Sequence, residues 1–286
     1  MSEHVTIMVN GTIYDMFGEF YYFVSEVYPE LRDFCCEHDI ELEFKDVSFS
    51  LYEKNVDTSH TILEYLNQID EDRTFYICFR GQRLGWIPDI NVIDKHTLDV
   101  FPELVNYIGT ITLNELSILH ALIPFDKFID GKKQDLHPVK HSLFYFRKSD
   151  YLCSIEPDKR PFYLDENGKD DDEVRDMKVA KAKDIVHDIK RDFDKEEKGS
   201  NIIIRDYDGK YDENIKLFDI IEKYTKICSD LSGLSYEELI KLFEPLSFRD
   251  IHGCVTDFEY EGRPLKDVMI EDFKREIQLE FPEKFN

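Results

Sequence analysis

The sequence lacks both long apolar runs and a surplus of basic residues. No apolar stretch approaches the roughly 18 to 20 residues that cross a membrane, and the first residues, MSEHVTIMVNGTIYDMF, have no basic or apolar leader region. The 286 residues include 36 Lys and Arg against 61 Asp and Glu, which gives a formal charge of −25. A chain with this charge repels phosphate backbones and anionic membranes. We therefore expect a cytoplasmic protein that binds neither nucleic acid nor a membrane.

Several motifs of metal and nucleotide chemistry are also missing. The six cysteines form no C-x-x-C pair, so we interpret them as reduced, mostly buried thiols. No G-x-x-x-x-G-K-[ST] motif is present, which excludes the phosphate loop of an NTPase. The segment Asp206–Asn214 (DYDGKYDEN) resembles a calcium loop, but Gly209 comes two positions too early and the final Glu is missing. We predict no metal site and no resident cofactor.

What the sequence does contain indicates a doubly wound α/β fold. Hydrophobic residues make up 42% of the chain, with 22 Phe and 16 Tyr, which is enough for a substantial core. Short β-rich runs alternate with stretches whose apolar residues recur every three or four positions, the pattern of a parallel sheet with helices on both faces. The predicted strands are His4–Asn10, Ile40–Val47, Thr74–Arg80 and His141–Phe146, and the predicted helices are Met16–His38, Thr58–Ile69 and Thr112–Ile123.

The composition divides the chain into three parts. Residues 1–155 form the α/β core, and residues 156–200 form a charged loop and helix inserted into it. Residues 201–286 complete the same domain with a last strand at Asn201–Arg205 and a helical C-terminal extension. The helices of that extension are predicted at Asn214–Leu231, Tyr236–Phe243 and Lys266–Phe281. The acidic run Asp170–Glu173 is interpreted as a solvated loop, with recruitment of a basic partner as the alternative.

Six segments, in order, carry a resemblance to a known family. They are IMVNGTIYDM (7–16), YPELRDFC (28–35), GQRLGWIP (81–88), TITLNELSI (110–118), LFYFR (143–147) and PLKDVMIEDFKREIQLEFP (264–282). Together they resemble the TIR-like N-terminal domain that precedes NACHT-type NTPase modules in nephrocystin, telomerase-associated proteins and bacterial STAND proteins. The resemblance implies a flavodoxin/TIR-like sheet and an intracellular signalling or interaction role.

The departures from the family pattern bear on the function. The paired serines that the family has after the first strand are Asn10 and Gly11 here, and of its D-x-R-W-G motif after the second strand only Asp46 remains, in DVSFS. These losses favour a module that acts through protein contacts, with a partner protein or with a second copy of itself. Family members continue into the NTPase, so the end at Asn286 is consistent with a stand-alone version or with an excised domain.

An enzymatic alternative rests on Glu115. In TIR domains and in nucleoside deoxyribosyltransferases, which the family resembles in fold, a glutamate at this helix start faces a ribose. The resemblance thus implies an N-glycosidase that cleaves NAD or a nucleotide, with Glu115 stabilising or trapping the cation-like sugar. However, Thr112-x-x-Glu115 is also the pattern of a capping box, in which Glu115 only secures the helix N-terminus.

The expected ligand-binding residues follow the carboxyl ends of the predicted strands. In open α/β sheets ligands bind at that edge, which makes Asn10–Thr12, Asp46–Ser48 and Arg80–Arg83 the candidate segments. Arg83 could pair with a phosphate, Trp86 could stack on a base and Asp15 could bond a ribose hydroxyl. Alternatively, Trp86 anchors a surface loop and Asp15 caps the first helix. The full candidate set is Asn10, Gly11, Asp15, Asp46, Arg83 and Trp86. A non-catalytic nucleotide sensor that uses the same pocket is a third alternative.

Overall fold

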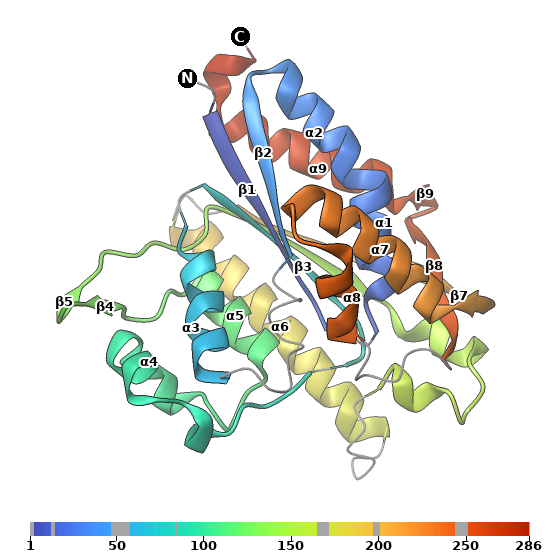
Figure 1. Cartoon of the computed structure of the whole chain (residues 1–286), viewed down its shortest axis with the longest axis horizontal. Coiled ribbons are helices and arrows are strands. Elements are labelled where there is room, and N and C mark those ends of the chain that lie inside the picture. The colour runs from blue at the N-terminus through green and yellow to red at the C-terminus, as the bar shows by residue number, and fades with distance from the viewer. Residues whose placement is uncertain are drawn as a thin grey trace.

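A seven-stranded sheet runs through the middle of the molecule, as Figure 1 shows for the computed structural model. The structure describes residues 3–12, 15–46, 58–71, 73–83, 85–164, 172–196, 201–243 and 251–285. The sheet has the order β2-β1-β3-β6-β7-β8-β9. Its strands are β1 (Glu3–Asn10), β2 (Ile40–Asp46), β3 (Thr74–Arg80), β6 (His141–Arg147), β7 (Asn201–Lys216), β8 (His252–Tyr260) and β9 (Arg263–Pro264).

The first five strands in this order are parallel, whereas β8 and β9 are antiparallel. Counted along the chain, the parallel strands have the order 2-1-3-4-5, one of the two common doubly wound arrangements. The predicted α/β class with a mostly parallel sheet is therefore confirmed.

Helices cover both faces of the sheet (Figure 1). One layer contains α3 (Thr58–Ile69), α5 (Leu113–Leu122) and α6 (Asp172–Glu196). The other contains α1 (Phe17–Tyr22), η1 (Phe23–Val27), α2 (Tyr28–Glu37), α7 (Leu217–Ser232), α8 (Tyr236–Phe243) and α9 (Leu265–Glu280). Successive residues of β3 alternate between the two cores, since Ile77 packs with the second layer and Cys78 with the first. No helix in the described part of the chain is long and apolar enough to cross a membrane.

Smaller elements connect these layers. They are α4 (Lys95–Val100), the hairpin of β4 (Phe128–Ile129) and β5 (Lys132–Lys133), and the short helices η3 (Ile90–Val92), η4 (Pro102–Asn106), η5 (Ser149–Ser154), η6 (Arg160–Phe162) and η9 (Pro282–Lys284). The helix predicted at Met16–His38 is confirmed as one continuous run from α1 through a π-helical segment, η1, to α2. In this run Gly18 has no room for a Cβ atom, which would clash with the Val255 carbonyl oxygen of β8.

The third part of the chain differs from the prediction. The strand expected at Asn201–Arg205 is not the last strand but the first part of β7, which continues to Lys216 and then pairs with β8. Polar, half-exposed residues fill the second half of β7, and this composition suggested a loop and a helix start at Asn214. Because β7 continues to Lys216, α7 begins only at Leu217. The acidic run Asp170–Glu173 lies outside the described side chains.

The C-terminal helix α9 packs on this domain and is joined to the sheet by a buried charged cluster. His141, at the start of β6, bonds Glu276 through Nδ1 (2.8 Å) and Glu280 through Nε2 (3.0 Å). Its ring stacks on Phe75 at a centroid distance of 4.4 Å. Burial raises the pKa of Glu276, but the hydrogen bond and charge of His141, together with hydrogen bonds from Arg275 and Asn201, outweigh burial and hold that pKa below its ordinary value of 4.5.

The Glu276 carboxylate therefore stabilises the fold at neutral pH. Because its pKa is lowered in the folded state, its contribution is present above the unfolded pKa and is lost as the pH falls through the folded pKa. We expect Glu276→Gln to lower the free energy of unfolding by about 1.5–3 kcal/mol at pH 7. This loss should become smaller as the pH is lowered below 4.5, and urea denaturation at each pH measures it. The exposed Glu283→Gln is the control, and an equal loss at pH 7 and pH 3 would contradict this role.

Candidate functional site

The topological switch point of the sheet lies between β1 and β3, which end at Asn10 and Arg80. The Asn10 amide is fully engaged inside the protein. Its Nδ2 donates to Tyr76 Oη at 2.5 Å and to Ser117 Oγ at 2.9 Å, and its Oδ1 accepts from Tyr65 Oη at 2.6 Å. In this arrangement Asn10 joins β1 to β3, α5 and α3 and presents no free polar atom to a ligand.

The turn after β1 is packed as tightly. A Cβ at Gly11 would lie 2.9 Å from the Phe20 ring and 3.0 Å from the Phe79 carbonyl oxygen, so only glycine fits. Asp15 is 3% exposed, accepts a hydrogen bond from Thr12 and pairs with Arg147 Nη2 at 3.3 Å. The carboxylate expected to bond a ribose hydroxyl thus faces the interior.

Arg147 forms the centre of a buried polar cluster at the end of β6. Its guanidinium donates to Glu19 Oε1 (2.6 Å), to the Asp15 carbonyl (3.0 Å) and to Tyr151 Oη (3.0 Å). Tyr207 Oη, from β7, donates to the same Glu19 oxygen at 2.8 Å. The side chains of Arg147, Glu19 and Asp15 have no exposed surface. The cluster therefore joins β6, β7 and α1 through hydrogen bonds between buried side chains.

Burial and charge act in opposite directions on these groups. Burial raises the pKa of Glu19, and the charge of Arg147 lowers it only in part. For Arg147 burial favours the neutral form, but Glu19 and the neighbouring tyrosines outweigh burial and hold its pKa well above the ordinary value. Arg147 is therefore a buried cation whose stability depends on the acidic side chains of α1 and its turn.

Arg83 and Trp86 lie in the segment that follows β3. Arg83 is 8% exposed, and its Nη1 donates to the carbonyl oxygens of Phe162 (2.8 Å) and Leu164 (3.0 Å). It thus holds the segment around η6 against the sheet. Trp86 is 54% exposed, and the loop is fixed beside it by the backbone hydrogen bond from Leu113 N to Trp86 O (3.0 Å). The indole is therefore available for contacts and is not a buried anchor.

Glu115 forms the capping box at the start of α5. Its Oε2 accepts from the Thr112 amide and from Thr112 Oγ1, both at 2.8 Å, and its own amide donates to Thr112 Oγ1 at 3.2 Å. This geometry directs the carboxylate back onto the helix end. The Asp46 side chain, at the end of β2, lies outside the described side chains.

Sequence reasoning missed the roles of two strand-terminal arginines. Arg147 was part of the LFYFR resemblance, and Arg80 lay in a candidate segment, but neither was assigned a role. Each arginine is the last residue of a strand that is mostly apolar, TFYICFR for Arg80 and HSLFYFR for Arg147, and both are nearly fully buried. An arginine that closes a buried strand requires an anion or acceptors nearby, and that signal could have identified both residues.

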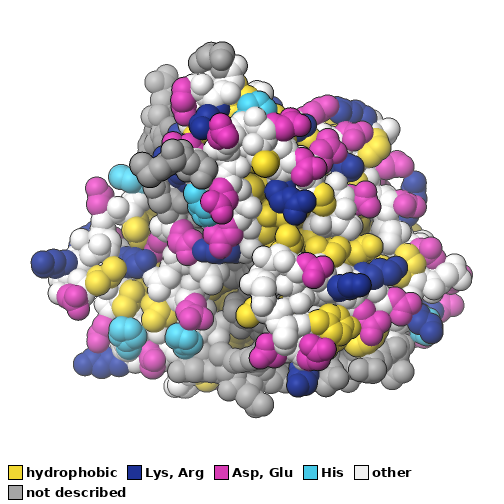
Figure 2. All heavy atoms as spheres, turned by 45° about the horizontal axis from the view of Figure 1, so that its top comes forward, with side chains coloured by type: hydrophobic (Ala, Val, Ile, Leu, Met, Phe, Trp, Pro, Cys, Tyr) yellow, Lys and Arg dark blue, Asp and Glu magenta, His cyan; other side chains and the backbone are white. Residues whose placement is uncertain are grey.

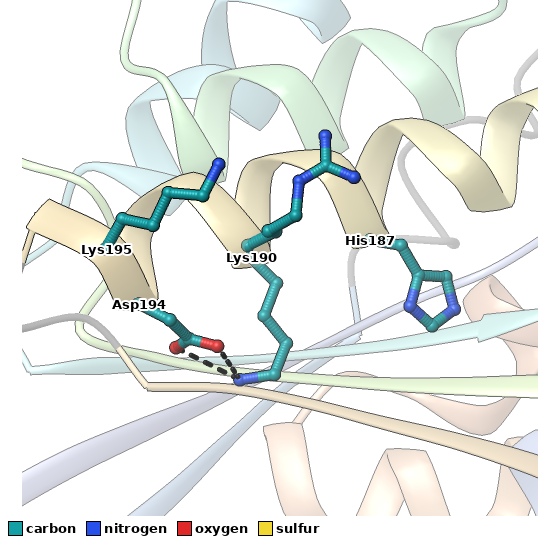
Figure 3. A pocket seen from close by; sticks show the side chains of 5 residues that line it. His187, Lys190, Asp194 and Lys195 are labelled. Carbon is teal, nitrogen blue, oxygen red and sulfur yellow. Dashed lines mark hydrogen bonds and ion pairs between the residues drawn. The ribbon is translucent and has the colours of Figure 1, made fainter.

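Figure 3 shows a surface depression that is remote from this edge. Its lining residues all come from the second half of α6, which leads into the start of β7 at the opposite edge of the sheet. Lys190 pairs with Asp194 at 3.2 Å, and Arg191 pairs with Asp188 at 2.9 Å on the same helix. The depression is thus a solvated helix face. Among the described residues no cluster of His, Cys, Asp or Glu could hold a metal.

The Arg147 cluster yields a stability prediction. Arg147→Met removes the cation and leaves Glu19 and Asp15 buried, so we expect the free energy of unfolding to fall by about 3–5 kcal/mol. Adding Glu19→Gln should restore part of this loss, because it removes one uncompensated buried acid. Tyr151→Phe, the control, removes one hydrogen bond and should cost about 1 kcal/mol. Urea denaturation measures all four proteins, and a loss below 1 kcal/mol for Arg147→Met would contradict the role of the cluster.

No family model matches the chain, and no solved structure matches it. The TIR-like relationship therefore stays a prediction from the sequence motifs, and the function has to be inferred from the residues themselves.

Proposed function

We propose that this chain is an intracellular signalling or interaction module of the TIR-like, STAND/NACHT-associated type, and that it acts through protein contacts. One observation carries the proposal. The segment after β3 exposes four large apolar side chains within seven residues: Trp86 (54%), Ile87 (48%), Ile90 (37%) and Val92 (46%). We call this segment, residues 86–92, the apolar loop. Apolar residues concentrated at one surface site mark contacts with other proteins.

The apolar loop is held in a defined conformation. The backbone carbonyl oxygen of Trp86 accepts a hydrogen bond from Leu113 N, at the start of α5. Asp89 Oδ1 accepts from the Asn91 amide at 2.9 Å, and beyond the loop Asp94 Oδ1 caps α4 by accepting from the Thr97 amide at 2.7 Å. A preordered apolar surface loses less conformational entropy on binding than a flexible one. The loop therefore has the properties of a docking surface.

Charge favours a different protein over a second copy as the partner. The formal charge is −25, and Figure 2 shows acidic side chains spread over the face that it displays rather than gathered in one patch. Two such molecules repel each other, although physiological salt screens charges beyond about 8 Å. A partner with basic residues around an apolar centre would be attracted from a distance and held at the loop.

The apolar loop can be tested with one double variant. We expect Trp86→Ser with Ile87→Ser to weaken partner binding about 10- to 100-fold, because aromatic and branched anchors dominate interface energies. Quantitative affinity capture measures partner binding, and sedimentation equilibrium measures self-association. Trp86 is the only tryptophan, so binding at the loop should also protect it from acrylamide quenching. Ile129→Ser, 50% exposed on the β4–β5 hairpin, is the control, and equal binding by the double variant would contradict the proposal.

The N-glycosidase alternative is less well supported, because both Asp15 and Glu115 are engaged within the protein. We expect neither the parent nor Glu115→Gln to release nicotinamide from NAD or bases from nucleosides, assayed by chromatography at high protein concentration. Glutamine also fits the third position of a capping box, so the variant should lose only about 0.3–1 kcal/mol of stability. Base release by the parent and not by the variant would favour the enzyme.

A further inference from the structure

The guanidinium of Arg80 is a buried cation without a partner among the described residues. Arg80 is 3% exposed, and its Nη1 is buried and forms no hydrogen bond. Cys78, two residues earlier on the same face of β3, does not supply an anion. Burial raises the pKa of the Cys78 thiol to about 12, and Arg80 opposes this only in part. On the neighbouring strand the residue that faces Arg80 in register is Phe146.

Unpaired acceptors occur in the same region. Asn114, in the first turn of α5, is 6% exposed, and its Oδ1 accepts no hydrogen bond from the described residues. Gln82 is 5% exposed, and its Oε1 likewise accepts none from them. Ser117, one turn after Asn114, contacts Asn10 and Tyr76. Because α5 starts at the carboxyl edge of the sheet, Asn114 lies one turn closer to that edge than Ser117, at the level where Arg80 ends β3.

The backbone around these groups is shaped for close approach. Gly85 has φ +98. A Cβ there would lie 3.2 Å from the Thr12 methyl carbon and 3.3 Å from the side-chain nitrogen Nδ2 of Asn114. A buried donor and buried acceptors without partners destabilise a protein unless a bound group satisfies them.

We propose that Arg80 and Asn114 bind an oxyanion that also carries hydroxyl groups, such as the phosphate end of a sugar phosphate. The guanidinium would pair with the phosphate oxygens, and a ligand hydroxyl would donate to Asn114 Oδ1. This site is distinct from the Arg147 cluster, whose cation is already paired with acids of the chain. The proposal is independent of partner binding at the apolar loop.

The test measures thermal unfolding of the full chain with three probes: inorganic phosphate, ribose 5-phosphate and ribose. Ionic strength is matched with sodium chloride, since screening alone stabilises a protein of charge −25. At saturation we expect ribose 5-phosphate to raise Tm by on the order of 5 °C, phosphate by less and ribose not at all. No rise with either phosphate probe, or an equal rise with ribose, would overturn the proposal.

Two substitutions separate binding from folding. Arg80→Met should abolish the rise with ribose 5-phosphate and should leave Tm without ligand unchanged or higher, because it removes an unpaired buried charge. Arg80→Lys should keep the charge but weaken binding about tenfold, since lysine lacks the planar fork. The control is Arg191→Met, whose arginine is 62% exposed on α6. An Arg80→Met protein that unfolds at lower temperature and still responds to ribose 5-phosphate would overturn the proposal.

Discussion

The pairing of the Arg147 cation with Glu19 and Asp15 is the interaction on which the carboxyl edge of the sheet depends. It joins the end of β6 to α1 and to the turn after β1, and Tyr207 brings in β7. Gly81 is part of the same constraint, because a Cβ there would lie 2.5 Å from Asp15 Oδ2 and 2.8 Å from Arg147 Nη2. This side of the switch point is therefore filled by the charges of the protein itself.

The two faces of the sheet differ at this edge. On the α1 face Arg147 has acids and a tyrosine as partners, whereas on the α5 face Arg80 ends β3 without one among the described residues. Both arginines end apolar strands, so local sequence does not distinguish them. The difference comes from the opposite layer, where α1 supplies Glu19 and the first turn of α5 supplies the neutral Asn114. The contrast is one of charge rather than of complete hydrogen bonding, because Arg147 Nε and Glu19 Oε2 also lack a hydrogen-bond partner among the described residues, yet Arg147 is paired with acids and Arg80 is not.

Much of the fold was predictable, since Thr58–Ile69 and Thr74–Arg80 match α3 and β3 to the residue. Strong periodicity in buried elements explains this success. The failure at β7 and β8 has a physical reason as well: an antiparallel ribbon with one wet face contains Asp, Asn and Lys, which also form loops. The site was harder still, because Asp15 and Arg147, which pair with each other, lie 132 positions apart and no local pattern encodes that contact.

The apolar loop and the Arg80 region share a boundary. A Cβ at Gly85 would lie within 3.3 Å of the Thr12 and Asn114 side chains. The carbonyl oxygen of the next residue, Trp86, accepts the hydrogen bond from Leu113 N that fixes the loop to α5. An oxyanion bound by Arg80 and Asn114 would thus sit directly behind the residues that orient the apolar loop. If that anion alters the affinity of the loop for its partner, the partner must alter the affinity for the anion by the same factor, because linkage between two binding sites is reciprocal. A ligand at the switch point would then act on the proposed protein contacts through the position of the loop, without any chemistry at Glu115.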